Sequence, residues 1–185
     1  LQRLQSQVDN EDWYSVINEC SNLLPEYPNS PVLWNVFGLG HMRVGNFSGA
    51  KMAFAEAISL KADFAAAYLN HGILCRELGQ LEEALSSFLS AKNYDPENVN
   101  LLNDIGNILI EMGKIQDAIL YLKQSVELSP KKSSFKFNLA NAFKIAGECD
   151  QAEVFYREAI KLDPTNIQFR DNFSIFLEDM GRFDQ

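Results

Sequence analysis

A glycine recurs every 34 residues along this chain, and no other feature of the sequence constrains its fold as strongly (79 − 45 = 34). The recurring residues are Gly45, Gly79, Gly113, Gly147 and Gly181. Around each glycine, small and large apolar residues recur at helical spacing and in the same register. A fixed period of 20–50 residues indicates a stacked repeat protein, in which each unit packs only against its neighbours.

Each period is predicted to contain two helices, with the glycine in the turn between them. Side chains able to cap a helix stand where each first helix begins, as at Ser30, Asn98 and Asn166. Prolines spaced at multiples of the period end the preceding second helix, because proline cannot donate a helical hydrogen bond. They are Pro28, Pro96, Pro130 and Pro164. The first turn lacks its glycine and carries Glu11 instead.

The repeats are predicted to form a single array over residues 1–185. Full repeats are expected at residues 31–64, 65–98, 99–132 and 133–166, after a partial repeat at 1–30 and before a truncated repeat at 167–185. An array cut within a repeat is expected to be part of a longer protein. It should also leave Phe173, Phe176 and Leu177 partly uncovered, since a repeat helix cannot bury its apolar face alone.

Small residues recur where the two helices of a repeat are expected to cross. Gly38, Gly72 and Gly106 share one register of the first helix. Glycine inside a helix costs about 1 kcal/mol relative to alanine, so its repetition indicates a steric requirement. The second helix carries Ala50, Ala84, Ala118 and Ala152, each four residues before Phe54, Phe88, Leu122 or Tyr156.

The charge and cysteine content exclude several classes of protein. The chain of 185 residues has a net charge of −9, which disfavours nucleic acid and anionic membranes as partners. Its three cysteines are too few for a disulfide scaffold and favour a reducing compartment, so we expect a cytoplasmic protein. No apolar run approaches the roughly 18 residues of a membrane-spanning helix.

These patterns resemble the tetratricopeptide repeat, a helix–turn–helix unit of 34 residues. The best copy matches at Trp34, Phe37, Gly38, His41, Gly45, Phe47, Ala50, Phe54 and Ala57. The resemblance covers essentially the whole chain without an insertion. It implies an all-α fold, a right-handed superhelix of antiparallel helix pairs, in which the first helices line a concave groove that holds a peptide or partner protein.

By the same resemblance, polar residues of the first helices become candidate groove residues. They are Asn70, Arg76, Asn103, Asp104, Asn107, Asn138, Asn141, Lys144 and Asn172. Asn70, Asn138 and Asn172 share one register, and asparagine can donate and accept hydrogen bonds to an extended backbone at once. The row is similar to the asparagine ladder of O-linked N-acetylglucosamine transferases and related bacterial proteins. Asp104 and Val36 depart from it, and a merely solvated helix face is the alternative.

No catalytic, cofactor or metal site is expected in this sequence. His71 and Cys75 lie one helical turn apart, but a structural zinc site takes four ligands and the sequence places no third or fourth nearby. Both histidines fall at positions expected to pack in the core. The sequence therefore predicts a non-catalytic scaffold that binds a protein or peptide. The alternatives are the substrate-recruiting or regulatory arm of a larger enzyme, such as a glycosyltransferase or sulfotransferase, and a purely structural role in assemblies of undetermined size.

Overall fold

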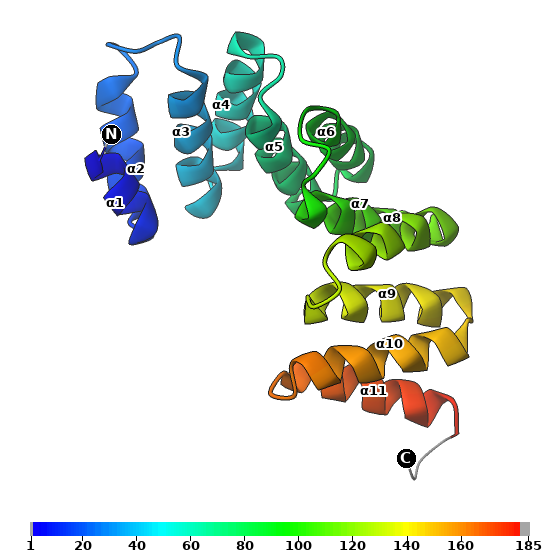
Figure 1. Cartoon of the computed structure of the whole chain (residues 1–185). Helices are drawn as coiled ribbons and strands as arrows, with labels where there is room; N and C mark the ends of the chain where they lie inside the picture. The colour runs from blue at the N-terminus through cyan, green and yellow to red at the C-terminus, as the bar shows by residue number, and fades with distance from the viewer. Residues whose placement is uncertain (1, 182–185) are drawn as a thin grey trace. The chain divides into compact units, whose positions relative to one another are not determined.

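The computed structural model describes the backbone of residues 2–181 and the side chains of residues 4–181. Over that span it is entirely helical, which confirms the predicted all-α fold of antiparallel helix pairs (Figure 1). The helices are α1 (Gln2–Asp9), α2 (Trp13–Leu23), α3 (Pro31–Arg43), α4 (Phe47–Leu60), α5 (Ala65–Glu77), α6 (Leu81–Tyr94), α7 (Val99–Glu111), α8 (Ile115–Leu128), α9 (Ser133–Ala146), α10 (Cys149–Leu162) and α11 (Ile167–Asp179). The expected start of a further helix, at residues 182–185, lies outside the described residues.

The chain divides into two compact units, Leu1–Glu97 and Asn98–Gln185. The first unit contains α1 to α6 and the second contains α7 to α11. Within each unit the two helices of a repeat pack against each other, and the first helices of neighbouring repeats are also in contact, α3 with α5 and α7 with α9. None of the helices between residues 2 and 181 combines the length and apolar character that crossing a bilayer requires.

The first helices begin where the sequence places capping residues. The Ser30 hydroxyl accepts a hydrogen bond from the Leu33 N–H at 3.3 Å, and Pro31 occupies the first position of α3. Asn98 and Asn166 cap α7 and α11 in the same way, at 3.2 and 3.3 Å. Each cap satisfies an amide that has no partner within its helix, which contributes about 1 kcal/mol.

The turns between paired helices share one backbone conformation. Every turn glycine has a φ between +67° and +80°, the left-handed region that glycine adopts freely. After α5, the Gln80 N–H donates to the Cys75 carbonyl at 2.8 Å, the six-residue bond that closes a helix end. Glu11 takes the glycine's place after α1 with a φ of +55°, and the Asp12 N–H donates to the Gln7 carbonyl at 3.0 Å. The first repeat therefore forms the same turn with a residue unsuited to it.

Close approach of the paired helices explains the glycines inside the first helices. A methyl group on Gly72 would lie 2.6 Å from the Phe88 ring, well inside van der Waals contact. Gly38 and Gly106 face the large residue of their own second helices in the same way. The predicted steric requirement is confirmed. In exchange, the facing side chains are buried almost completely, which stabilises the fold by about 1.5–3 kcal/mol each.

The last repeat is better packed than expected. Phe176 is only 1% exposed, so the prediction that it would be partly uncovered is wrong. Its ring packs against Tyr156 of α10, with the ring centroids 5.4 Å apart, and against Phe173. Phe173 and Leu177 are half-buried, as expected. Phe176 on α11 is therefore buried against the aromatic side chains of the preceding repeat, although no described helix follows α11.

Candidate functional site

The predicted site residues all lie on the first helices of the repeats, and we call the surface that these helices share the first-helix face. In the first unit it is formed by α3 and α5, and in the second unit by α7, α9 and α11. The family resemblance pointed to this face. The structure adds which of its asparagines contact one another.

In the first unit the site centres on a pair of asparagine side chains. The Asn70 amide on α5 donates from Nδ2 to Oδ1 of Asn35 on α3 at 3.0 Å. Asn35 is 9% exposed and Asn70 is half-buried, so the bond is partly shielded from water. Each asparagine thereby fixes the orientation of the other, and their remaining amide groups have a defined direction.

The second unit repeats this arrangement. The Asn138 amide on α9 donates from Nδ2 to Oδ1 of Asn103 on α7 at 2.8 Å. Asn103 is 8% exposed and Asn138 is half-buried, as in the first pair. Both pairs join residues 35 positions apart, one more than the length of a repeat. The bonded partners therefore occupy adjacent registers rather than the single register of the predicted row.

This offset explains why the predicted row is interrupted. The residue 35 positions before Asn172 is Phe137, whose side chain offers no acceptor, and Asn172 donates instead to the Gln168 carbonyl of its own helix at 2.9 Å. The residue 35 positions before Asp104 is Leu69. Asp104 is half-buried on α7. Asparagine pairs thus form where both adjacent registers are polar, which happens once in each unit.

The other predicted residues have different surroundings. The hydroxyl of Tyr156 on α10 donates to Oδ1 of Asn141 at 2.6 Å. Asn141 therefore links α9 to the second helix of its own repeat and not to a neighbouring first helix. Lys144 on α9 forms an ion pair with Asp179 on α11 at 3.2 Å. Asn107 is half-buried one turn after Asn103, and Arg76 is exposed in the last turn of α5.

An apolar cavity in the first unit was not predicted from the sequence. It has a volume of about 570 Å³ and lies among α1, α2 and α3, with Leu4, Leu23, Val32, Leu33 and Val36 in its lining. Val36 follows Asn35 directly, so the cavity and the asparagine pair share α3. The one feature of the sequence that could have indicated this cavity is Val36, an apolar residue at a position where the later repeats carry asparagine or aspartate.

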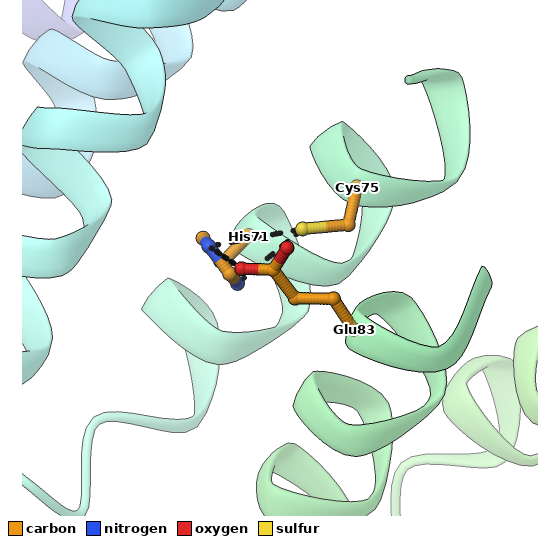
Figure 2. Close-up of side chains that lie close together, drawn as sticks. All are labelled: His71, Cys75 and Glu83. Atoms are coloured by element: carbon orange, nitrogen blue, oxygen red, sulfur yellow. Dashed lines mark hydrogen bonds and ion pairs between the residues drawn. The ribbon is translucent and has the colours of Figure 1, made fainter. Parts of the chain in front are cut away.

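The two histidines differ in their surroundings. His41 is half-buried, and its ring packs against Phe37 with ring centroids 4.4 Å apart. His71 instead lies beside Cys75 and the Glu83 carboxylate of α6, whose ligand atoms all fall within 4.8 Å of one another (Figure 2). Sequence spacing identified the first two of these residues and missed Glu83, which the packing of α6 on α5 brings near.

Comparisons with known proteins agree with this architecture. A family described as tetratricopeptide repeat matches residues 36–98 and 103–167, which is more than half of the chain. Among solved structures, PilW, a type IV pilus biogenesis factor, superposes with a TM-score of 0.88 at 20% sequence identity, over 98% of this chain and 84% of PilW. The protein YrrB, described as having an unusual peptide-binding site, superposes with a TM-score of 0.75 at 19% identity, over 89% of this chain and 85% of YrrB.

One curated relative also matches in sequence. It is protein FlbA of Caulobacter vibrioides, which is 36% identical to this chain over 59 residues. The match spans 32% of this chain and about a tenth of the length of FlbA. It therefore concerns a short stretch of repeats and not the whole of either protein.

Proposed function

Because the chain belongs to the tetratricopeptide repeat family, we propose that it is a protein-interaction scaffold that holds an extended peptide or a partner protein along its first-helix face. Folds of this family are in general protein-binding scaffolds. One structural neighbour, YrrB, is described as having a peptide-binding site, and this supports the same role for the present chain. The proposal places no catalytic step in these repeats.

The observation that carries the proposal is the pair of amide–amide contacts, Asn70 to Asn35 and Asn138 to Asn103. An isolated asparagine on a helix surface rotates freely and loses that freedom when it binds a ligand. Here the amide orientation is fixed before any ligand arrives, which lowers the entropic cost of binding. A merely solvated helix face gives no reason for the same contact to recur in both units.

The chemistry of these amides favours a peptide backbone as ligand. An asparagine amide has two N–H donors and a carbonyl with two lone pairs, and the contact with its neighbour uses only one donor of Asn70 or Asn138. The remaining donor and acceptor match the alternating C=O and N–H groups of an extended chain. Such contacts read the backbone and tolerate many side chains. The proposal thus includes an asparagine ladder of the kind found in O-linked N-acetylglucosamine transferases, interrupted at Asp104 and Asn172.

The proposal is tested with an array of unrelated peptides probed with the full chain, followed by affinity measurements on the peptides that bind. Replacing Asn70 or Asn138 with alanine is expected to weaken binding about 2- to 10-fold, since one hydrogen bond contributes about 0.5–1.5 kcal/mol. Methylating the backbone nitrogens of a bound peptide should abolish binding, whereas changing its side chains should have smaller effects. Asn172→Ala should matter less, because its amide donates to its own helix.

Asn93→Ala is the matched control, because Asn93 is an exposed asparagine on α6, a second helix. Circular dichroism establishes that each variant folds. If peptides bind equally well to the parent, to Asn70→Ala and to Asn138→Ala, the first-helix face is not the binding surface. If no peptide on the array binds, backbone recognition as the function is refuted.

The wider setting of this scaffold is part of the proposal. All three thiols are free, with Cys20 and Cys75 buried, which supports a reducing compartment such as the cytoplasm. The net charge of −9 supports a protein or peptide partner rather than nucleic acid or a membrane surface. The comparisons do not favour the alternative, an arm of a larger enzyme.

A further inference from the structure

A cluster of three potential metal ligands lies inside the second full repeat, between α5 and α6, where His71 directly follows Asn70 of the first asparagine pair. His71 and Cys75 lie one turn apart on α5, and Glu83 lies near the start of α6. Figure 2 shows the imidazole, thiol and carboxylate of these residues converging on one point between the two helices. We propose that His71, Cys75 and Glu83 bind one zinc ion, with water as the fourth ligand.

The distances suit such an ion. Nε2 of His71 lies 3.7 Å from Sγ of Cys75 and 3.7 Å from Oε1 of Glu83. Zinc bonds of about 2.0–2.3 Å in a tetrahedron place imidazole, thiolate and carboxylate atoms roughly 3.3–3.6 Å apart. These two edges are within a few tenths of an ångström of that geometry. Sγ of Cys75 also lies 3.7 Å from Nδ1 of His71, so the Cys75 side chain must rotate toward the Nε2 lone pair when the ion binds.

A neighbouring residue orients the histidine as metal ligands require. The Ser87 hydroxyl lies 2.9 Å from Nδ1 of His71, whereas the Glu83 carboxylate lies 3.7 Å from the other ring nitrogen, Nε2. When the Nδ1–H donates a hydrogen bond to the Ser87 hydroxyl oxygen, Nε2 is left with a free lone pair that can bind the ion. Zinc-bound histidines commonly have this kind of hydrogen bond on their second nitrogen. Ser87 is buried and lies one turn after Glu83 on α6, so a single helix supplies both the ligand and the orienting group.

The exposure of the cluster allows an ion to enter. Cys75 is fully buried and the His71 side chain is 13% exposed, whereas the Glu83 side chain is 42% exposed. An ion can therefore reach the cluster from solvent on the Glu83 side, and His71 and Cys75 would bind it from positions that are largely shielded from water. Imidazole and thiolate together select borderline metals such as zinc over magnesium or calcium, which prefer all-oxygen sites. On binding, the Cys75 thiol gives its proton to solvent and bonds the ion as a thiolate.

One contact opposes the ion and gives the proposal a specific prediction. The Lys51 ammonium on α4 lies 3.0 and 3.1 Å from the two oxygens of Glu83. It must release at least one oxygen when zinc binds, and its positive charge repels the ion. Lys51 and Glu83 are both nearly half exposed, so the lysine can turn into solvent at small cost. Removing Lys51 should therefore strengthen zinc binding, whereas removing any ligand should weaken it.

The test uses cobalt(II) as a spectroscopic substitute for zinc, added to the reduced 185-residue chain. Binding should produce a thiolate-to-cobalt charge-transfer band that stoichiometric zinc abolishes. Cys75→Ser should remove the band. Glu83→Gln should weaken cobalt affinity at least tenfold, and Lys51→Ala should raise it several-fold. Glu83→Gln changes a half-exposed side chain and should fold normally, so it keeps the test informative if the buried Cys75 variant does not.

Cys149→Ser is the matched control, because Cys149 lies in the second unit and outside the cluster. It should leave the band and the affinity unchanged. A chain that shows no thiolate–cobalt band, or whose band survives Cys75→Ser, refutes the site. An affinity that Glu83→Gln does not alter refutes the carboxylate as a ligand and with it the proposed three-residue centre.

Discussion

Glu11 is the residue whose replacement tests the turn geometry most directly. It occupies the position that glycine holds in every other described turn between paired helices, with a φ of +55° and the same closing hydrogen bond. Its side chain is exposed and lies on the surface. Glu11→Gly should therefore stabilise the first repeat by removing backbone strain without removing a buried contact.

The expected gain follows from two opposing terms. A residue with a Cβ pays roughly 1–2 kcal/mol to hold the left-handed conformation. Glycine is more flexible in the unfolded chain, which offsets roughly 0.5–1 kcal/mol of that gain. The net stabilisation should be about 0.5–1 kcal/mol, which corresponds to an increase in melting temperature of about 1–4 °C for a chain of this size.

Urea unfolding followed by tryptophan fluorescence is a suitable assay, because both tryptophans report on the affected region. Trp13 begins α2, directly after the turn, and Trp34 lies on α3, the next helix. The midpoint should rise in Glu11→Gly while the slope of the transition stays constant, since the surface exposed on unfolding does not change.

Glu11→Ala is the matched control, because it removes the carboxylate and keeps the strained backbone. It should leave the midpoint nearly unchanged. Gly79→Ala tests the reverse change at a turn where a methyl group meets no atom within 4 Å, and it should cost about 1 kcal/mol through backbone strain alone. A gain in Glu11→Ala equal to that in Glu11→Gly, or a loss in Glu11→Gly, would show that the charge and not φ determines stability here.

Three further predictions concern the core. Gly72→Ala should lower the free energy of unfolding by about 1–3 kcal/mol in urea unfolding, because the new methyl group overlaps the Phe88 ring at 2.6 Å; an unchanged midpoint would contradict the steric argument. Burial raises the pKa of Tyr156 to about 12 from an ordinary value of 10, so stability should fall as pH rises above about 10, where only the unfolded phenol ionises. Tyr156→Phe should remove that part of the alkaline loss in urea titrations at several pH values, and should cost about 1 kcal/mol at pH 7 through the lost hydrogen bond to Asn141. Burial also raises the pKa of the Cys20 thiol to about 12, so at pH 8 mass spectrometry should find Cys20 alkylated only after the chain is unfolded; rapid labelling of the folded chain would contradict its burial.

The sequence predicted helix positions, turns and packing glycines because these depend on local periodicity. A glycine with a φ of +72°, such as Gly79, and a cap such as Ser30 act within a few residues of themselves. Their identity is therefore enough to locate them. The steric role of Gly72 was also predictable, since its repetition in one register implies the same neighbour in each repeat.

The side-chain contacts between helices were less predictable. Asn70 was predicted as a groove residue, but its bond to Asn35 depends on a one-residue stagger between α3 and α5 that the 34-residue period conceals. Glu83 comes near His71 only because α6 folds back against α5. The burial of Phe176 likewise depends on the Tyr156 ring opposite it. Each of these contacts depends on how two helices are placed against each other, and the spacing of residues within one helix does not determine that placement.

The 35-residue separation of the paired asparagines has a consequence for how such a chain tolerates insertions and deletions. The packing pattern recurs in every repeat, whereas the pairs begin at Asn35 and Asn103, two repeats apart (103 − 35 = 68). Deleting residues 99–132 would keep the helix pattern in phase but set Leu69 at the position that Asn103 now holds relative to Asn138. Deleting residues 65–132 would instead align Asn35 with Asn138 and recreate a pair. The asparagine pairs are therefore preserved only when two repeats are inserted or deleted together, although the helix pattern stays in phase when a single repeat is gained or lost.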